Sequence, residues 1–334
     1  MNENYLLKVE GEQVSFFTSL GEVKAVNDIS FTLKEGEILG IVGESGSGKS
    51  VTAYSIIKLI PEPGKVIDGS ITFDGNEINF YSEKEMRNLR GNDISMIFQD
   101  PMTSLNPLYT IGNQICEVIK LHTSKTRKES KEHAIKLLTE VGISEPYKRM
   151  KQYPHELSGG MRQRVMIAIA LACEPKLLIA DEPTTALDVT IQAQILDLMV
   201  NLQKQYGMSI ILITHDLGVV ASTCKKIAVM YAGKIVEYGT AEDIFYKPAH
   251  EYTKGLLNSI PILDSKEDKR LIPIPGVPVD MLNLPKGCSF ASRCESCMKI
   301  CLKEPPPTTF LSKDHYASCW LLHKNSVEGV ESGD

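Results

Sequence analysis

The chain has 334 residues, of which 43% are hydrophobic and 23% are charged, values typical of a globular protein with a substantial core. The net charge of −6 does not favour general binding to nucleic acid. The longest apolar run, Val165–Cys173, is too short to cross a membrane. The first residues lack the basic start and apolar stretch of a secretory signal, so we expect the protein to stay in the cytosol.

The first third of the chain contains short stretches in which apolar and polar residues alternate. Ile29-x-Phe31-x-Leu33 is one example, and Ile71–Phe73 followed by Asp74-Gly75 is another. Alternation of this kind with turn residues at its ends predicts strands of an antiparallel sheet.

A glycine-rich sequence follows the apolar run Ile38–Val42 and precedes a helical pattern that ends at Pro61. Its glycines allow the backbone N–H groups to point inward, and the helix start adds a positive end, so the loop is suited to phosphate. Lys49 would bridge the β- and γ-phosphates of a nucleotide, and the Ser50 hydroxyl would ligate Mg²⁺. The alternative is a flexible glycine turn. The predicted nucleotide-binding residues are Gly43, Glu44, Ser45, Gly46, Ser47, Gly48, Lys49, Ser50 and Val51.

The middle of the chain is charged and helical in pattern from about residue 107 to 153, which predicts an inserted helical subdomain at about residues 101–165. Ser158 then opens a further helix together with Gly159 and Gly160. This pattern has two interpretations. It is a simple helix N-cap, or its N–H groups and helix dipole bind a γ-phosphate.

Two short apolar runs, 177–180 and 209–213, are typical of central parallel strands, and residues 190–206 between them have helical spacing with a stop at Gly207. The first run is followed by Asp181 and Glu182. Asp181 would hold Mg²⁺ directly or through water, and Glu182 would act on the attacking water as general base. The alternative is a strand that ends in a solvated acidic turn. The phosphate-binding loop upstream favours the catalytic interpretation.

The last part of the chain is rich in proline and cysteine and has little periodicity, so we expect a C-terminal module at 261–334 after a domain at 1–260. Four of its cysteines are separated by five, six and seventeen residues: Cys288, Cys294, Cys301 and Cys319. Four thiolates bind either a [4Fe–4S] cluster or tetrahedral zinc, and unmetallated thiols are a third possibility. Cys297 forms a Cys-x-x-Cys pair with Cys294, which is typical of zinc sites.

The order of these motifs over about residues 5–258 resembles the nucleotide-binding subunits of ATP-binding cassette (ABC) transporters. The resemblance rests on the glycine-rich loop, Gln99, Ser158-Gly-Gly, Asp181-Glu182, Asp188 and His215. It implies an α/β fold, a P-loop NTPase cassette with a RecA-like core, an antiparallel β-subdomain and an inserted helical subdomain. It also implies that two such subunits enclose two ATP molecules, each bound by one chain's P-loop and the other chain's Ser158, Gly159 and Gly160.

The same resemblance implies roles for single residues. Gln99 would contact Mg²⁺ and the attacking water, His215 the γ-phosphate, and Asp188 the opposite subunit. Phe16, or failing that Phe17, would stack on adenine. Met161 stands where many members have glutamine, a difference that leaves the backbone contacts unaffected.

Segments at residues 246–257, 274–278 and 284–288 resemble the C-terminal part of oligopeptide and dipeptide import ATPases, with Glu251 in place of the usual proline. This implies ATP-driven peptide uptake with two membrane permeases, a peptide-binding protein and a second ATPase subunit, which is either a relative or another copy. It also implies a peripheral location on the cytoplasmic face of the membrane, and it favours the iron–sulfur cluster at the four cysteines.

Alternative cargoes are nickel and oligosaccharides. A mechanical ATPase acting on ribosomes or nucleic acid is disfavoured, because the chain has one cassette and no long coiled-coil insert. A nucleotide-binding module without turnover is disfavoured by Glu182.

Overall fold

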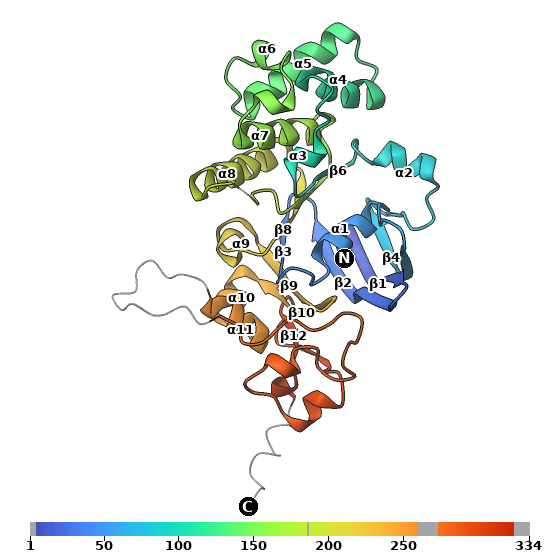
Figure 1. Cartoon of the computed structure of the whole chain (residues 1–334), viewed down its shortest axis with the longest axis vertical. Coiled ribbons are helices and arrows are strands. Elements are labelled where there is room, and N and C mark those ends of the chain that lie inside the picture. Colours follow the sequence, from blue (N-terminus) through green and yellow to red (C-terminus); the bar gives the residue numbers. More distant parts are fainter. Residues whose placement is uncertain (1–4, 186, 260–272, 324–334) are drawn as a thin grey trace, which may run out of the picture. The chain divides into compact units, whose positions relative to one another are not determined.

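The structure is a computed structural model that describes residues 5–185, 187–259 and 273–323 (Figure 1). It divides into two compact units, each of which is discontinuous in sequence. The described part of the first lies within Met1–Leu7, Leu33–Ile38 and Thr72–Ile213. The described part of the second lies within Lys8–Thr32, Leu39–Ile71 and Thr214–Asp334.

Three parallel strands, β6 (Ile94–Ile97), β7 (Leu177–Asp181) and β8 (Ser209–Thr214), form the sheet of the first unit, with β7 in the middle. Every residue of β7 and β8 is buried, which explains why both strands read as continuous apolar runs. The strands predicted at 177–180 and 209–213 are confirmed. Their common direction brings the residues that follow them to one edge of the sheet.

The segment from about residue 107 to 153 forms helices, as predicted, and further helices lie before and after it. They are α2 (Glu83–Leu89), α3 (Pro101–Ser104), α4 (Ile111–His122), α5 (Arg127–Glu140), α6 (Pro146–Arg149), the 3-10 turn η1 (Pro154–Glu156), α7 (Gly159–Ala170) and α8 (Val189–Tyr206). Helices α4, α5 and α7 contact one another (Figure 1), and each contributes fully buried apolar residues: Ile115, Leu137 and Val165. Helix α8 ends at Gly207, whose φ of 67° is the left-handed conformation that favours glycine.

The N-terminal strands form a small sheet in the order β2 (Gly21–Lys34), β1 (Tyr5–Thr18), β4 (Gly64–Phe73) and β5 (Asn76–Glu77). The two-residue connection between β1 and β2 makes them a hairpin. These strands confirm the antiparallel sheet expected from the alternating pattern. Helix α1 (Lys49–Ile56) ends before the predicted stop at Pro61, and Lys58 takes a left-handed φ of 51° just beyond it.

A second sheet portion, within the second unit, runs in the order β3 (Ile38–Val42), β9 (Lys226–Tyr231), β10 (Lys234–Thr240), β12 (Tyr316–Ser318) and β11 (Thr308–Phe310). Strands β3 and β9 are parallel, whereas the other neighbours are antiparallel. The C-terminal segment, residues 273–323, therefore extends the sheet portion of the second unit through β12 and β11. The helices of this unit are α9 (Leu217–Thr223), α10 (Ala241–Tyr246), α11 (Glu251–Asn258) and the 3-10 turns η2 (Ala291–Arg293), η3 (Lys299–Leu302) and η4 (Trp320–Leu322).

A buried carboxylate joins the C-terminal segment to strand β10. Glu237 is fully buried and accepts hydrogen bonds from the backbone N–H groups of Ala249 and His250, at 2.8 and 2.9 Å. Its Oε1 also lies 2.9 Å from Nε2 of His315, which is itself buried. A charge is tolerated inside a protein only with such partners. The boundary predicted at 260/261 falls in residues 260–272, outside the described residues.

Candidate nucleotide-binding site

The glycine-rich loop connects β3 to α1 in a conformation that requires glycine at two positions. Gly48 has a φ of 103°, and a Cβ atom there would lie 2.3 Å from the carbonyl oxygen of Ala25. A Cβ atom at Gly43 would lie 2.2 Å from the carbonyl oxygen of Met230. Both distances are far inside van der Waals contact with backbone that cannot swing aside. The loop is therefore closely fitted to the strands around it.

The predicted phosphate-binding lysine points into this loop. The Nζ atom of Lys49 donates to the carbonyl oxygens of Gly43 and Glu44, at 2.8 and 2.9 Å, and the residue is buried. The buried hydroxyl of Ser47 has no hydrogen-bond partner within the described part of the chain. An ammonium group and an unsatisfied hydroxyl inside a curled loop at a helix start fit the phosphates of a nucleotide. Ser50 lies half-buried in the first turn of α1.

In the first unit, the structure brings Gln99 and Glu182 together. The Nε2 atom of Gln99 donates to Oε2 of Glu182 at 3.0 Å, and the hydroxyl of Thr185 donates to the same oxygen at 2.9 Å. Gln99 follows β6 and Glu182 follows β7, and these strands are parallel neighbours. Thr185 was not predicted as a site residue. The signal in the sequence that points to it is a hydroxyl side chain three residues after Glu182. Asp181, the last residue of β7, is fully buried.

The backbone at Glu182 is unusual. Its φ of 46° is left-handed, which costs energy for a residue with a Cβ atom. Its N–H donates to the carbonyl oxygen of Ile213 on β8 at 2.9 Å, which fixes the turn. Strain that is held in place at the carboxyl edge of a parallel sheet is typical of a functional residue.

Two helices of the first unit begin with side-chain caps. The Ser158 hydroxyl accepts from the N–H of Met161 at 3.4 Å, so its interpretation as an N-cap of α7 is confirmed. The Asp188 carboxylate caps α8 by accepting from the N–H of Ile191 at 3.0 Å. A Cβ atom at Gly160 would lie 3.1 Å from the Ile191 side chain, so the two helix starts lie side by side. The predicted contact of Ser158, Gly159 and Gly160 with a γ-phosphate stays a prediction.

The remaining predicted residues differ in exposure. His215, directly after β8, is exposed and belongs to the second unit, as does the glycine-rich loop. Phe16 is half-buried, and its ring lies where a side chain at Gly64 would be. Phe17 is 47% exposed. The predicted contacts of His215, Phe16 and Phe17 with a nucleotide stay predictions.

The four C-terminal cysteines line one small pocket, together with Phe290, Trp320 and neighbouring side chains. Cys297 is exposed and does not line it. Burial raises the pKa of Cys288 and of Cys294 to about 11, so both free thiols are protonated at neutral pH. Within residues 5–185, 187–259 and 273–323, no three His, Cys, Asp or Glu side chains come together in a way that could hold a metal ion. Neither the [4Fe–4S] prediction nor its zinc alternative is confirmed.

Comparison with known proteins finds similarity over nearly the whole chain. Residues 26–185 match the family described as ABC transporter, and residues 236–301 match the one described as oligopeptide/dipeptide transporter, C-terminal region. The oligopeptide transport ATP-binding protein OppD of Bacillus subtilis (strain 168) is 56% identical over 96% of this chain and 90% of its own length. The dipeptide transport ATP-binding protein DppD of the same organism is 52% identical over 98% of each chain.

A solved dimeric ATP-binding cassette in a post-hydrolysis state, bound to ADP and Pi, is 27% identical to this chain. It superimposes with a TM-score of 0.64 and covers 70% of this chain and 98% of that one. Fold and loop geometry together define an ATPase of the ATP-binding cassette type. The chain belongs to the family of ATP-binding subunits of oligopeptide and dipeptide ABC transporters. Within the described residues, no helix combines the length and the apolar character needed to cross a membrane.

Proposed function

We propose that this chain is the ATP-hydrolysing subunit of an importer for dipeptides or oligopeptides. The observation that carries the proposal is the extent of the similarity. The peptide-transport relatives match over more than 90% of this chain, including its C-terminal region, whereas the solved cassette covers only 70% of it. The chain thus shares with the peptide transporters a segment that the cassette alone lacks.

In the proposed mechanism, ATP is enclosed between the glycine-rich loop of one subunit and Ser158, Gly159 and Gly160 of another. Lys49 binds the β- and γ-phosphates, and Glu182 accepts a proton from the attacking water. Ser50, Gln99 and Asp181 would hold Mg²⁺, which would neutralise charge on the phosphates. The Gln99–Glu182 hydrogen bond supports this assignment, since it joins a Mg²⁺ ligand to the base. His215 contacts the γ-phosphate, Asp188 contacts the opposite subunit, and Phe16 or Phe17 stacks on adenine.

The proposed partners are two membrane permeases, a second ATPase subunit or another copy of this chain, and, indirectly, a peptide-binding protein outside the membrane. The chain would then act at the cytoplasmic face of the membrane. ATP binding closes the subunit pair and hydrolysis reopens it, because the closed state prefers ATP to ADP and phosphate. The permeases convert this movement into alternating access.

We also propose that Cys288, Cys294, Cys301 and Cys319 would hold a [4Fe–4S] cluster, with zinc as the alternative, although in the described residues their side chains are not arranged as a metal site. Their common pocket and the exposure of Cys297 support this choice of four ligands. Iron, sulfide and zinc analysis of anaerobically purified protein tests it. Cys301→Ser should lose the cluster and its absorbance, whereas Cys297→Ser should keep both. Stoichiometric zinc without iron would favour the alternative, and protein free of both would overturn the metal assignment.

Uptake of a radiolabelled tripeptide tests the transport function in cells from which the gene has been deleted. Wild-type protein should restore uptake, and Lys49→Ala should fail to restore it although the protein accumulates normally. Copurification should recover the permeases. Restored uptake of nickel or an oligosaccharide instead of peptide would identify a different cargo, and recovery of ribosomes without permeases would overturn transport altogether.

A further inference from the structure

Arg293 is an unusual cation because it is almost completely buried although it lies in the irregular C-terminal segment. It ends the 3-10 turn η2, and its side chain is 3% exposed. The guanidinium carbon lies 5.9 Å from the ring centroids of Tyr231 and Phe290. A buried guanidinium needs a compensating partner, since its desolvation alone is costly.

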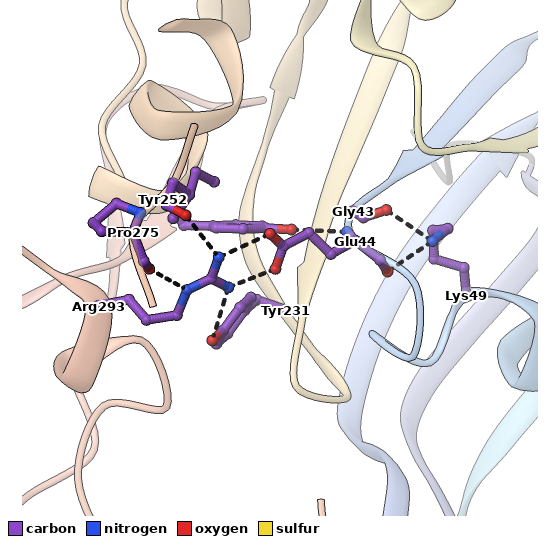
Figure 2. Close-up of polar contacts among 8 residues, drawn as sticks. Gly43, Glu44, Lys49, Tyr231, Tyr252, Pro275 and Arg293 are labelled. Atoms are coloured by element: carbon purple, nitrogen blue, oxygen red, sulfur yellow. Dashed lines mark hydrogen bonds and ion pairs between the residues drawn. The ribbon is translucent and has the colours of Figure 1, made fainter. Parts of the chain in front are cut away.

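That partner is Glu44, in the glycine-rich loop. The two terminal nitrogens of Arg293 donate to the two carboxylate oxygens of Glu44 at 2.6 and 2.9 Å, which is a bidentate ion pair (Figure 2). The Nε atom of Arg293 donates to the carbonyl oxygen of Pro275 at 2.9 Å. Bidentate pairing fixes direction as well as distance, so the Glu44 side chain has little freedom.

The backbone of Glu44 makes a hydrogen bond with a residue of α11. Its N–H donates to the hydroxyl of Tyr252, a fully buried residue of α11, at 2.8 Å. Its carbonyl oxygen, in contrast, accepts from Nζ of Lys49. Figure 2 shows the Glu44 carboxylate pointing toward Arg293 while its carbonyl group points toward Lys49. One loop residue thus connects the C-terminal segment to the phosphate-binding lysine.

A carboxylate in this loop is an electrostatic problem for an anion site. ATP brings a cluster of negative charge, and an unpaired carboxylate nearby repels it through a partly dehydrated medium. Arg293 neutralises Glu44 and keeps its carboxylate turned away from Lys49. Residues Pro278, Val279 and Met281 of the C-terminal segment also line a pocket together with loop residues 44–47, so the contact extends beyond one ion pair.

We propose that Arg293 is a positioning residue for ATP binding, which acts through Glu44 and makes the nucleotide affinity of the loop depend on the C-terminal segment. The inference rests on the proposed function of the glycine-rich loop as the ATP site. Arg293 itself touches no nucleotide in this proposal. It determines the position of the Glu44 carboxylate in the glycine-rich loop.

Titration calorimetry with ATP and Mg²⁺ on the full chain tests this dependence. Arg293→Ala should weaken ATP binding by about tenfold or more. It should raise KM for ATP while kcat at saturating ATP changes by less than about threefold, because no group on the reacting atoms is lost. The defect should shrink at high salt, which screens the exposed part of the Glu44 charge. The matched control is Lys299→Ala, which removes an exposed cation of the next turn, η3, and should leave binding unchanged.

The decisive comparison is made in the Glu44→Gln background, where no carboxylate remains to be neutralised. There, Arg293→Met should change ATP affinity by less than about threefold. This comparison also applies if Arg293→Ala alone does not fold. An equal loss of affinity in both backgrounds, or unchanged affinity of Arg293→Ala, overturns the inference. Wild-type protein that binds no ATP, or Lys49→Ala that binds it normally, overturns instead the assignment of the loop as the ATP site.

Discussion

Single residues carry the chemistry of this protein, and the backbone around them explains why they are positioned as they are. Glu182 has a left-handed backbone and two side-chain donors, Gln99 and Thr185, on one carboxylate oxygen. Both donors orient the Glu182 carboxylate. Orientation by fixed neighbours is what general-base catalysis requires.

Glu182→Gln should abolish most ATP turnover while leaving ATP binding intact, because the amide keeps the shape of the side chain but accepts no proton. We expect kcat to fall by about 10²- to 10⁴-fold. Phosphate release in a single turnover measures this loss of rate. Glu174→Gln is the control, since Glu174 is also left-handed, with a φ of 53°, but is exposed and away from the acidic pair. Turnover close to that of wild type would assign the base to another residue.

Glu12 is a buried acid on β1, and burial raises its pKa from 4.5 to about 7. Because the folded-state pKa is above the unfolded value, the folded protein retains a proton that the unfolded chain has lost between these pH values. The stability contributed by protonated Glu12 is present below about pH 4.5 and is lost as pH rises through about 7.

Glu12→Gln should therefore be more stable than wild type at alkaline pH, by up to about 3 kcal/mol, and the difference should disappear below about pH 4. Urea unfolding midpoints at several pH values measure this. Glu10→Gln, at an exposed position on the same strand, should leave the pH dependence unchanged. A Glu12→Gln variant with the pH dependence of wild type would contradict the buried-acid explanation.

At the scale of secondary-structure elements, the C-terminal segment is part of the protein's second sheet portion. Strand β12 pairs with β10, with Ala317 opposite Glu237 and Tyr316 opposite Tyr238. The buried Glu237 then fixes His315 and the start of α11. Two three-residue strands are too short to be stable alone, so the buried carboxylate contributes to holding them in register.

Glu237→Ala should loosen this junction, because two backbone N–H groups and an imidazole lose their acceptor inside the protein. The expected cost is about 3–5 kcal/mol of unfolding free energy. Thermal unfolding measures the overall loss, and limited proteolysis should show cleavage within the C-terminal segment. The exposed Glu242→Ala in α10 is the matched control. Unchanged protease resistance of Glu237→Ala would show that other contacts hold the segment.

At the scale of the whole molecule, the proposed mechanism needs two subunits, because Ser158–Gly160 would complete a site on another chain. If two copies of this chain suffice, ATPase activity per molecule should fall on dilution. A mixture of Lys49→Ala and Ser158→Arg, each inactive alone, should regain activity, since it forms one intact site. Steady-state phosphate release across a dilution series measures both effects. Activity independent of concentration, with no rescue in the mixture, would contradict a site shared between copies.

The sequence alone determined the parts of this protein that depend on local pattern. Apolar runs predicted β7 and β8, the spacing and Gly207 predicted α8, and the glycines predicted a phosphate loop between a strand and a helix. In each case a few neighbouring residues carry the constraint, through burial on both faces of a strand or through a backbone that only glycine adopts.

Contacts between residues far apart in the chain became clear only in three dimensions. Arg293 and Glu44 are 249 positions apart, and neither lies in a periodic pattern that would point to the other. The pairing of β12 with β10 and the donation from Thr185 to Glu182 were equally absent from the predictions. Such contacts arise where buried charges and unpaired backbone groups must find partners, and those partners are set by the packing of the whole chain rather than by its local sequence.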